Sequence, residues 1–427
     1  MSAPHTLLSR TLKAGRAQLA ACLLLCIAAV FPVSCTRTAP ENRLVIWHQM
    51  RPDERDILRT QLGRYMSQNP GLEVVELYKE TEELRSGFIV ASIAGQGPDL
   101  VYGPSDPVGI YEATKTIQPM EAYFTREYLA EFDSAGLLYY NGHLYMVADK
   151  IGNHLALVYN KKYVPVPPKT DVELIALSKK IQNKYGYTAS RPNVYGLSWN
   201  YTEPFFFIPF LTGSGGWVFG PDGRTPSLDT PEMVRALNYV RSLRDEQKII
   251  PNEADYEIAD ALFKDGKTAM LINGDWSWSG YAEKGIDLGV ATIPLMTGTG
   301  LWPAPMTSPK GYSINANVTE PRLKTVLHLL FFLLSEQSQL ETARALSTAP
   351  TRKALYRHPD ISSNEILQNS LLQIKRGRLM PVVPEMRAVW DAMRPGYQAV
   401  LGGARTPEQA ARDMQRLALK KIRDMNE

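Results

Sequence analysis

The stretch Leu44-Val45-Ile46-Trp47 is a short apolar run of the kind found in buried parallel strands. An amphipathic stretch of helical period follows it and ends at Asn69-Pro70-Gly71. A strand over residues 72–77, a helix over 81–94 and a strand over 99–102 come next. This order is βαβαβ, and right-handed crossovers place its strands in one parallel sheet, with ligands bound beyond their carboxyl ends.

Two further details are predicted for the helices. In the helix over 81–94, we expect Leu84, Phe88 and Ile93 to face inward. Thr230 is expected to cap a helix that begins at Pro231, and Thr406-Pro407-Glu408-Gln409 has the form of a capping box that opens the last helix.

The strand and helix pattern returns in the second half of the chain. Strands are predicted over residues 195–199, 268–272 and 288–293, with a helix over 231–244. Residues 326–334 are strongly apolar, but nine residues are too few to cross a bilayer, so a core helix is expected there. The sequence therefore predicts two α/β lobes.

Composition excludes two classes of protein. The 427 residues are 44% hydrophobic and 21% charged, which is enough apolar material for more than one core and argues against intrinsic disorder. Beyond residue 35, basic and acidic residues balance at 44 each. A nucleic-acid partner is not expected, because phosphate binding needs a local excess of positive charge.

The first 35 residues have the build of an export signal. A basic stretch ends at Arg16, an uncharged apolar run covers residues 19–33, and Ser34 precedes Cys35. Cleavage is expected, although the run is apolar enough that an uncleaved signal anchor is the alternative. Cys35 resembles the acylated first residue of a mature bacterial lipoprotein, but Pro32 stands where that pattern usually has leucine. The localisation expected is periplasmic or cell-surface, with a lipid anchor in a membrane.

The cysteines agree with this interpretation. The chain has three, Cys22, Cys26 and Cys35, so cleavage before Cys35 leaves one thiol and no internal disulfide. The mature chain must then be stabilised by its cores.

The common catalytic motifs are absent from the sequence. It contains no G-x-S-x-G elbow, Walker loop, H-E-x-x-H or paired C-x-x-C, and its six histidines lack metal-ligand spacing. We therefore expect no catalytic residue, metal site or cofactor.

Aromatic and polar residues gather in loops that follow predicted strands. Asn200 to Phe207 follows one strand, Asn273 to Trp278 follows another, and Trp390 with Arg394 lies on a helix near the end. A sugar presents apolar C–H faces and a rim of hydroxyls, so its site needs flat aromatic faces together with carboxylates and arginine. Each residue alone could belong to a lobe core, but the position beyond strand ends favours a sugar site.

Several motifs resemble one family in order along the chain. These are Leu44-Val45-Ile46-Trp47, Gly95-Gln96-Gly97-Pro98-Asp99, Tyr159-Asn160-Lys161, Glu203-Pro204, the segment from Phe263 to Trp278, and Met380-Pro381 through Trp390. Together they resemble the bacterial maltose/maltodextrin-binding proteins, which are family 1 extracellular solute-binding components of ABC importers.

The resemblance implies a two-lobed α/β periplasmic-binding-protein fold of type II, with a ligand cleft and a hinge of three crossings. The crossings are expected near Gly152, near residues 306–310 and near residues 359–367. The N-terminal lobe would then comprise residues 43–151 and 311–358, and the C-terminal lobe residues 152–305 and 366–427.

The resemblance also implies binding residues. Trp276 and Trp390 match the family's sugar-stacking tryptophans, and Phe205 stands where the family has a stacking tyrosine. The polar groups that match those holding sugar hydroxyls are Asp106, Glu203 and Arg394.

Other positions depart from the family pattern. Arg51 and Pro52 replace an Asp-Lys pair, Arg85 and Ser86 replace two adjacent glutamates, Gly103 replaces a tryptophan, and Asn153 replaces an acid. Arg51, Arg85 and Asn153 are therefore candidate ligand contacts. Two alternatives remain: a maltodextrin receptor with altered contacts, or a receptor for another disaccharide or for an anionic sugar that the arginines would pair.

The function implied is capture of an oligosaccharide by lobe closure and its delivery to membrane permease subunits, by a protein expected to be monomeric. Two other hypotheses share the same residues. A secreted glycoside hydrolase would use Asp106 and Glu203 as its carboxylate pair, and a sugar-sensing receptor would use the same binding site to signal. The sequence does not identify the sugar, its chain length or the affinity.

Overall fold

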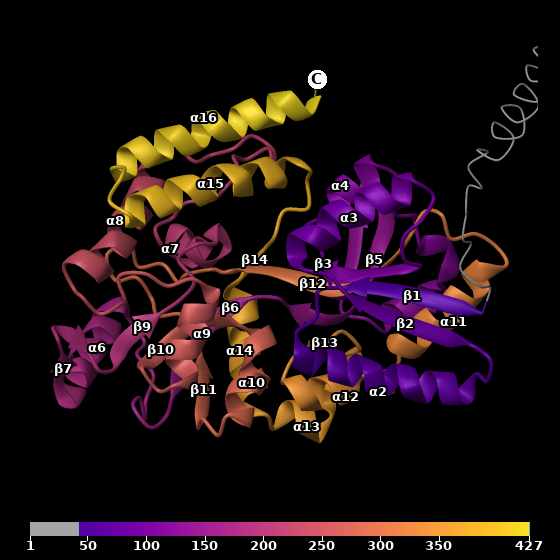
Figure 1. Ribbon diagram of the computed structural model, residues 1–427, viewed down its shortest axis with the longest axis horizontal. Coiled ribbons are helices and arrows are strands. Elements are labelled where there is room, and N and C mark those ends of the chain that lie inside the picture. The colour runs from indigo at the N-terminus through magenta and orange to yellow at the C-terminus, as the bar shows by residue number, and fades with distance from the viewer. Residues whose placement is uncertain (1–41, 427) are drawn as a thin grey trace, which may run out of the picture. The chain divides into compact units, whose positions relative to one another are not determined.

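The computed structural model describes residues 42–426. The predicted export segment, residues 1–35 with Cys35, lies outside the described residues. Residues 42–426 belong to one compact unit. Two sheets with separate helices divide this unit into two lobes (Figure 1). No helix within residues 42–426 combines the length and the apolar character that a membrane span needs.

The N-terminal lobe is built on a mixed sheet that has eight strands among the described residues, with the main order β13-β5-β12-β3-β1-β2. Its strands are β1 (Arg43–His48), β2 (Glu73–Tyr78), β3 (Leu100–Pro104), β4 (Leu137–Tyr140), β5 (His143–Gly152), β12 (Met306–Ile314), β13 (Ala349–Pro350) and β14 (Arg378–Leu379). Strand β1 pairs in parallel with both β2 and β3, as the βαβαβ pattern predicts. Strands β5 and β12 run antiparallel within the same sheet.

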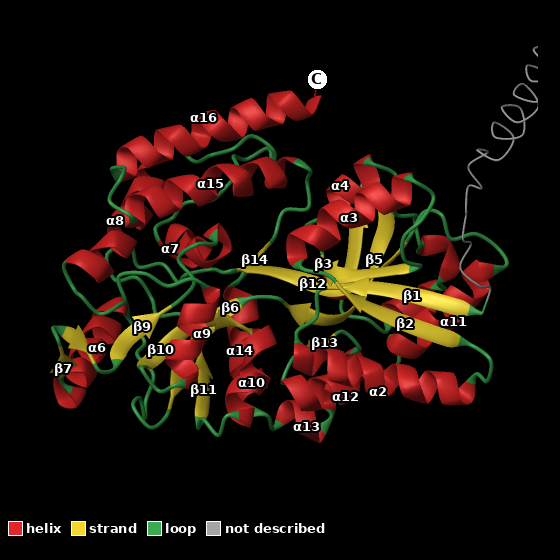
Figure 2. Ribbon diagram, in the orientation of Figure 1, coloured by secondary structure: helices red, strands yellow, loops and turns green. Residues whose placement is uncertain are grey.

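Helices cover both faces of this sheet (Figure 2). They are α2 (Pro52–Gln68), α3 (Thr81–Ile93), α4 (Val108–Ala113), α5 (Arg126–Ala130), α11 (Arg322–Leu333), α12 (Glu336–Leu346) and α13 (Pro359–Ser362). Leu58 and Leu62 of α2 join Leu329 and Leu330 of α11 in the core on one face. Helix α11 is therefore the core helix predicted from its apolar run.

The prediction that Ile93 of α3 faces inward is wrong. Leu84 and Phe88 are buried in the core with Val101 and Tyr111, but Ile93 is 68% exposed. Buried positions on a helix recur every three to four residues, so the inward position after Phe88 is Ser92, and Ile93 lies about 100° further around the helix.

The C-terminal lobe is built on a smaller sheet, which has four described strands in the order β11-β6-β10-β9. Its elements are β6 (Leu155–Asn160), α6 (Asp171–Tyr185), β9 (Tyr195–Ser198), α7 (Ile208–Gly213), α8 (Pro231–Asp245), α9 (Tyr256–Lys264), β10 (Thr268–Gly274), α10 (Trp278–Glu283), β11 (Leu288–Ala291), α14 (Glu365–Arg376), α15 (Glu385–Leu401) and α16 (Pro407–Asn426). A small hairpin of β7 (Tyr187–Thr188) and β8 (Arg191–Pro192) is attached.

The predicted helix caps are confirmed. The Thr230 hydroxyl accepts a hydrogen bond from the Met233 amide at 3.2 Å. At the start of α16, the Thr406 hydroxyl accepts from the Gln409 amide at 3.3 Å, and the Gln409 side chain accepts from the Thr406 amide at 3.1 Å. These bonds satisfy first-turn amides that have no partner inside their helix.

The chain passes from the large sheet to the small one between β5 and β6. Gly152 has φ +137°, and a Cβ built on it would lie 2.4 Å from a carboxylate oxygen of Asp275. Only glycine combines that backbone conformation with such a close approach. The Asn153 amide next to it donates to Asp275 Oδ2 at 3.1 Å, while its side chain donates to Ser308 Oγ on β12, also at 3.1 Å. The hydrogen bond to Ser308 therefore links the connection between β5 and β6 to the start of β12, so two segments that join the sheets lie side by side.

Candidate functional site

Two strand-end loops bring aromatic rings together in the C-terminal lobe. Strands β9 and β10 are parallel neighbours, so their carboxyl ends lie at the same edge of the sheet. The short helices after them are Pro204–Phe207 and Asp275–Ser277. Their rings, Phe205 and Trp276, lie 6.2 Å apart between centroids. Both rings are only partly buried, which leaves aromatic surface facing the space between the lobes.

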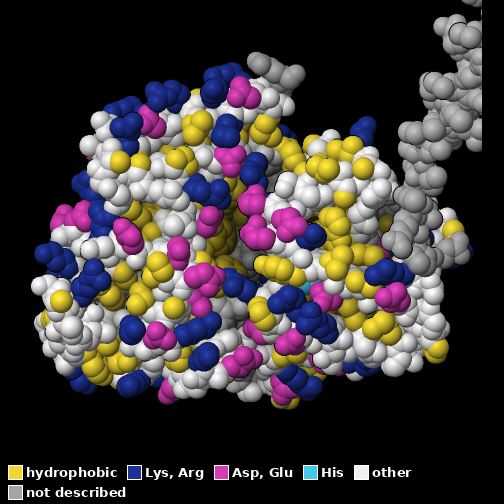
Figure 3. All heavy atoms as spheres, in the orientation of Figure 1, with side chains coloured by type: hydrophobic (Ala, Val, Ile, Leu, Met, Phe, Trp, Pro, Cys, Tyr) yellow, Lys and Arg dark blue, Asp and Glu magenta, His cyan; other side chains and the backbone are white. Residues whose placement is uncertain are grey.

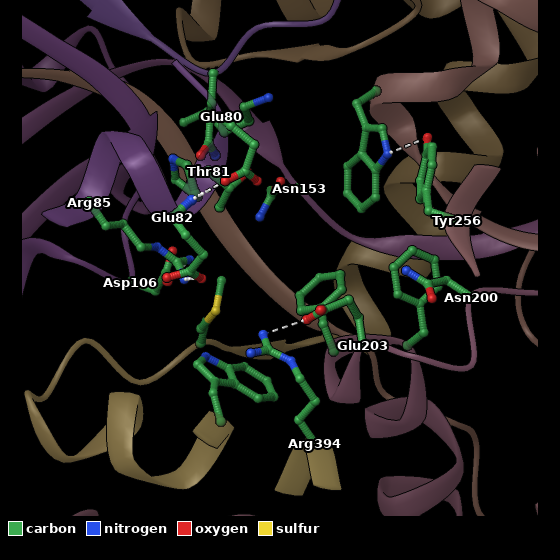
Figure 4. A pocket seen from close by; sticks show the side chains of 18 of the residues that line it. Glu80, Thr81, Glu82, Arg85, Asp106, Asn153, Asn200, Glu203, Tyr256 and Arg394 are labelled. Carbon is green, nitrogen blue, oxygen red and sulfur yellow. Dashed lines mark hydrogen bonds and ion pairs between the residues drawn. The ribbon is translucent and has the colours of Figure 1, made fainter. Parts of the chain in front are cut away.

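Helix α15 adds the second tryptophan from a distant part of the sequence. Trp390 has its ring centroid 6.5 Å from that of Phe205. Arg394 lies four residues further along the same helix face, and its guanidinium donates to Glu203 Oε2 at 3.0 Å (Figure 4). Burial lowers the pKa of Arg394, but the contact with Glu203 outweighs it and raises the pKa overall. The pair places charge beside the aromatic surface.

Tyr256 connects the stacking surface to the other lobe. Its hydroxyl accepts a hydrogen bond from Trp276 Nε1 at 3.1 Å, which fixes the plane of the indole (Figure 4). The guanidinium of Arg51, which follows β1, lies over the Tyr256 ring at 4.3 Å from its centroid. Arg51 is thus occupied by a cation–π contact across the cleft.

The N-terminal lobe contributes Arg85 of α3 and Asp106, which follows β3. Their side chains form an ion pair, and Arg85 also donates to Glu82 Oε1 at 3.1 Å (Figure 4). Burial lowers the pKa of Arg85, yet the two carboxylates raise it overall. The positive charge of Arg85 is therefore balanced inside the protein and is not free for a ligand anion.

A buried ion cluster forms the floor of the space between the lobes. The Glu54 carboxylate accepts from Lys150 Nζ at 2.5 Å and from Lys310 Nζ at 3.1 Å, and these three side chains are 3 to 7% exposed. Burial by itself would raise the pKa of Glu54. The two ammonium groups lower this pKa by more than burial raises it, so the pKa of Glu54 lies below its usual value. Glu54 is also near the first turn of α2, where the helix dipole favours negative charge.

These groups surround a single cavity of about 380 Å³. The space-filling view shows the surface hollowed between the lobes, with acidic side chains along the rim (Figure 3). All nine residues predicted from the sequence line the cavity: Arg51, Arg85, Asp106, Asn153, Glu203, Phe205, Trp276, Trp390 and Arg394. The structure brings them together, while their contact with a ligand stays a prediction.

The charges around this cavity nearly cancel. Among the described residues, six acids line it, Glu54, Glu80, Glu82, Asp106, Glu203 and Asp391, and five bases, Arg51, Arg85, Lys310, Arg387 and Arg394. No group of three or more His, Cys, Asp or Glu within residues 42–426 is arranged to hold a metal ion. Charged side chains make strong hydrogen bonds to hydroxyl groups, and a cavity with nearly balanced charge does not favour a charged ligand. Together with the aromatic faces, these charged residues suit a neutral ligand that is rich in hydroxyl groups.

Several lining residues were not anticipated from the sequence. Glu82 and Tyr256 reach the cavity from α3 and α9, and Arg387 reaches it one turn before Trp390 on α15. The spacing from Arg387 through Trp390 to Arg394 was the one available signal, since residues three or four apart share a helix face. Tyr256 and Glu82 had no such signal, because their neighbours belong to other elements.

Two α/β lobes with a ligand-sized cavity between them define a two-lobed ligand-binding protein. A family model described as bacterial extracellular solute-binding protein matches residues 62–369. The chain belongs to this family of extracellular solute-binding proteins, as the resemblance in its sequence implies.

Three relatives illustrate the likeness. A solved structure described as a maltose/maltodextrin-binding domain MalE from Bdellovibrio bacteriovorus bound to maltotriose is 42% identical, with a TM-score of 0.85, and the match covers 90% of this chain and all of that one. A maltotriose-binding protein of Pyrococcus abyssi is 27% identical over 364 residues, which is 84% of this chain and 78% of the relative. A maltooligosaccharide ABC transporter solute-binding lipoprotein of Streptococcus pneumoniae is 23% identical over 328 residues, 75% of each chain. The structural match confirms the predicted two-lobed α/β fold.

Proposed function

We propose that this protein binds a neutral maltodextrin-type oligosaccharide between its lobes and delivers it unaltered to the permease subunits of an ABC importer. The observation that carries the proposal is the set of aromatic faces, Phe205, Trp276 and Trp390, around one cavity whose arginines each contact a partner inside the protein. The relatives with maltotriose and maltooligosaccharide in their descriptions support the same ligand class.

Pairing of the arginines favours a neutral sugar over an anionic one. Arg85 is held by Asp106 and Glu82, and Arg51 lies on the Tyr256 ring. An anionic sugar would have to compete with the two carboxylates that hold Arg85. A neutral sugar would add hydrogen bonds to them instead.

Lobe closure supplies the binding mechanism. The stacking rings belong to the C-terminal lobe, whereas Arg85 and Asp106 belong to the N-terminal lobe. A sugar that contacts both sets stabilises the closed arrangement by the contacts that exist only there, which is a shift of population. The proposed lobe boundaries are 43–151 with 311–358 and 152–305 with 366–427. They are supported by the passage of the chain between sheets after β5 and before β12. The short strand β14 falls within 366–427, although it pairs with the first residues of β12, Met306 and Thr307.

The proposal extends to the place of the protein in the cell. Export, cleavage before Cys35 and lipid attachment there would tether a monomer near the permease, and the lipoprotein named among the relatives supports this arrangement.

The test is titration calorimetry with maltotriose. We expect one binding site in the wild-type protein and a loss of about 1 to 3 kcal/mol in Trp276→Ala, the usual cost of removing an aromatic anchor. The matched control is Trp217→Ala, because Trp217 packs against Arg378 and does not line the cavity. Unchanged affinity in Trp276→Ala would contradict the site, and absence of maltotriose binding in the wild type would contradict the function.

The hydrolase hypothesis is less favoured by the same contacts. A glycosidase needs two carboxyl groups that are free to reach the glycosidic bond. Asp106 and Glu203 are instead each engaged in an ion pair inside the protein, with Arg85 and Arg394. Incubation with maltotriose followed by an assay for new reducing ends separates the two functions. A transport assay in a deletion strain separates delivery to a permease from sensing.

A further inference from the structure

Two contacts between the lobes lie at opposite ends of the cavity, which stays partly open to solvent. At one end, Arg387 of α15 forms an ion pair with Glu82 of α3 at 2.5 Å. At the other, Arg51 lies over the ring of Tyr256. Glu82 and Tyr256 stand on opposite sides of the cavity (Figure 4). All four residues line the cavity, so the contacts bound the ligand space itself.

The first of these contacts is held in place from both lobes. The Glu82 carboxylate accepts from Arg387 with one oxygen and from Arg85 with the other. The Arg387 guanidinium also lies 3.2 Å from Asp391 one turn along α15. A side chain with an anion on each side has fewer ways to turn aside than a free one, so this pair is a defined barrier.

The second contact is anchored as well. The Tyr256 hydroxyl is bound to the Trp276 indole at 3.1 Å, and next to Arg51 on the N-terminal lobe, Asp53 accepts a hydrogen bond from Ser279 of α10. Moving Tyr256 away would disturb a stacking ring. This end is therefore the less adaptable of the two, and a longer ligand would have to leave past Glu82 and Arg387.

The space between these two contacts is small. A volume of about 380 Å³ is near the lower limit of ligand pockets, which hold roughly 300 to 1,000 Å³. A chain that extends past Glu82 and Arg387 has to break their ion pair, and this cost falls on long chains alone. The two side chains are 42% and 47% exposed, so the cost is that of a solvent-exposed pair.

Resting on the proposed function, we propose that Glu82 and Arg387 form an end stop that restricts this site to short oligosaccharides. The two residues determine ligand length, and the stacking rings determine that the ligand is a sugar. Specificity is the difference between two affinities. The end stop increases this difference by lowering the affinity for the longer oligosaccharide, in addition to the contacts that favour the shorter one.

The experiment compares maltotriose with maltoheptaose by titration calorimetry. In the wild type we expect maltotriose to bind about fivefold more tightly than maltoheptaose, a difference of about 1 kcal/mol, which is the upper end for a solvent-exposed ion pair. Arg387→Ala should reduce this ratio to below about twofold, or about 0.4 kcal/mol, and Glu82→Gln should reduce it in the same direction. Arg387→Lys keeps a cation that can reach Glu82 and should retain most of the wild-type ratio.

The control is Arg416→Ala, because Arg416 pairs with Asp413 on the outer helix α16 and does not line the cavity. It should leave the ratio unchanged. Equal affinity of the wild type for both sugars, or a wild-type ratio in both Arg387→Ala and Glu82→Gln, overturns the end stop while the proposed function stands. Failure of the wild type to bind either sugar overturns the proposed function and the end stop together.

Discussion

Replacement of Glu54 by glutamine tests whether the floor of the cleft is held by charge. Glu54, Lys150 and Lys310 are all nearly inaccessible to solvent, with separations of 2.5 and 3.1 Å from the carboxylate oxygen to the two ammonium groups. Exposed ion pairs contribute about 0 to 1 kcal/mol, but removing one partner of a buried pair costs about 3 to 5 kcal/mol because the other charge is left uncompensated. We therefore expect Glu54→Gln to lower the free energy of unfolding by about 3 to 5 kcal/mol.

The same contact predicts a pH dependence. The two lysines lower the folded-state pKa of Glu54 below its usual value of 4.5. Stabilisation by this group is therefore complete above about pH 4.5 and is lost as the pH falls toward the folded-state pKa. The stability difference between the wild type and Glu54→Gln should be largest at neutral pH and should shrink below about pH 4.5.

The assay is urea unfolding followed by circular dichroism at several pH values. Glu365→Gln is the matched control: Glu365 also pairs with a lysine, Lys161 at 3.3 Å, but its side chain is 69% exposed. It should cost no more than about 1 kcal/mol. A Glu54→Gln variant as stable as this control, or a wild-type-to-variant gap that does not change between neutral and acidic pH, would refute the reasoning.

Three other predictions follow from single contacts. Gly152→Ala should lower the free energy of unfolding by about 1 to 3 kcal/mol, because the backbone conformation at residue 152 disfavours a side chain and the new Cβ would meet Asp275. Urea unfolding measures this free energy, and a variant as stable as the wild type would contradict the prediction. Gly274→Ala should weaken maltotriose binding without unfolding the protein, because the new Cβ would lie 2.1 Å from a ring atom of Trp276 and displace the indole. Calorimetry measures the affinity and circular dichroism checks the fold. An affinity equal to that of the wild type would show that the position of the Trp276 ring is unimportant for binding. Cys35→Ser should abolish incorporation of labelled fatty acid into the protein, as followed by immunoprecipitation; label retained in this variant would contradict lipid attachment at Cys35.

Much of the fold was predictable from local sequence. The strands β1, β2 and β3 and the caps at Thr230 and Thr406 depend on residues close together in the chain, and the structure confirms them. Ile93 shows the limit: its side chain is as apolar as that of Phe88, and only the phase of the helix against the sheet decides that it faces solvent.

The aromatic half of the candidate site was also within reach of the sequence. Phe205 and Trp276 follow strands that turn out to be parallel neighbours, so the rule that ligands bind beyond strand carboxyl ends places them together. The partners of the charged residues were harder to predict from the sequence. Arg51 and Arg85 suggested an anionic ligand as one alternative, but their contacts with Tyr256 and Asp106 come from other elements and could not be foreseen from the sequence.

The amino-acid sequence by itself determined the class of fold, the lobe cores and the residue types around the cavity, because hydrophobic period, capping and strand-end position are local properties. Tertiary structure alone decided which charges pair with one another and which residues lie at the ends of the cavity. Glu82 and Arg387 are 305 positions apart, and a Coulomb interaction depends on the distance between the charged atoms in space, which their separation along the chain does not give.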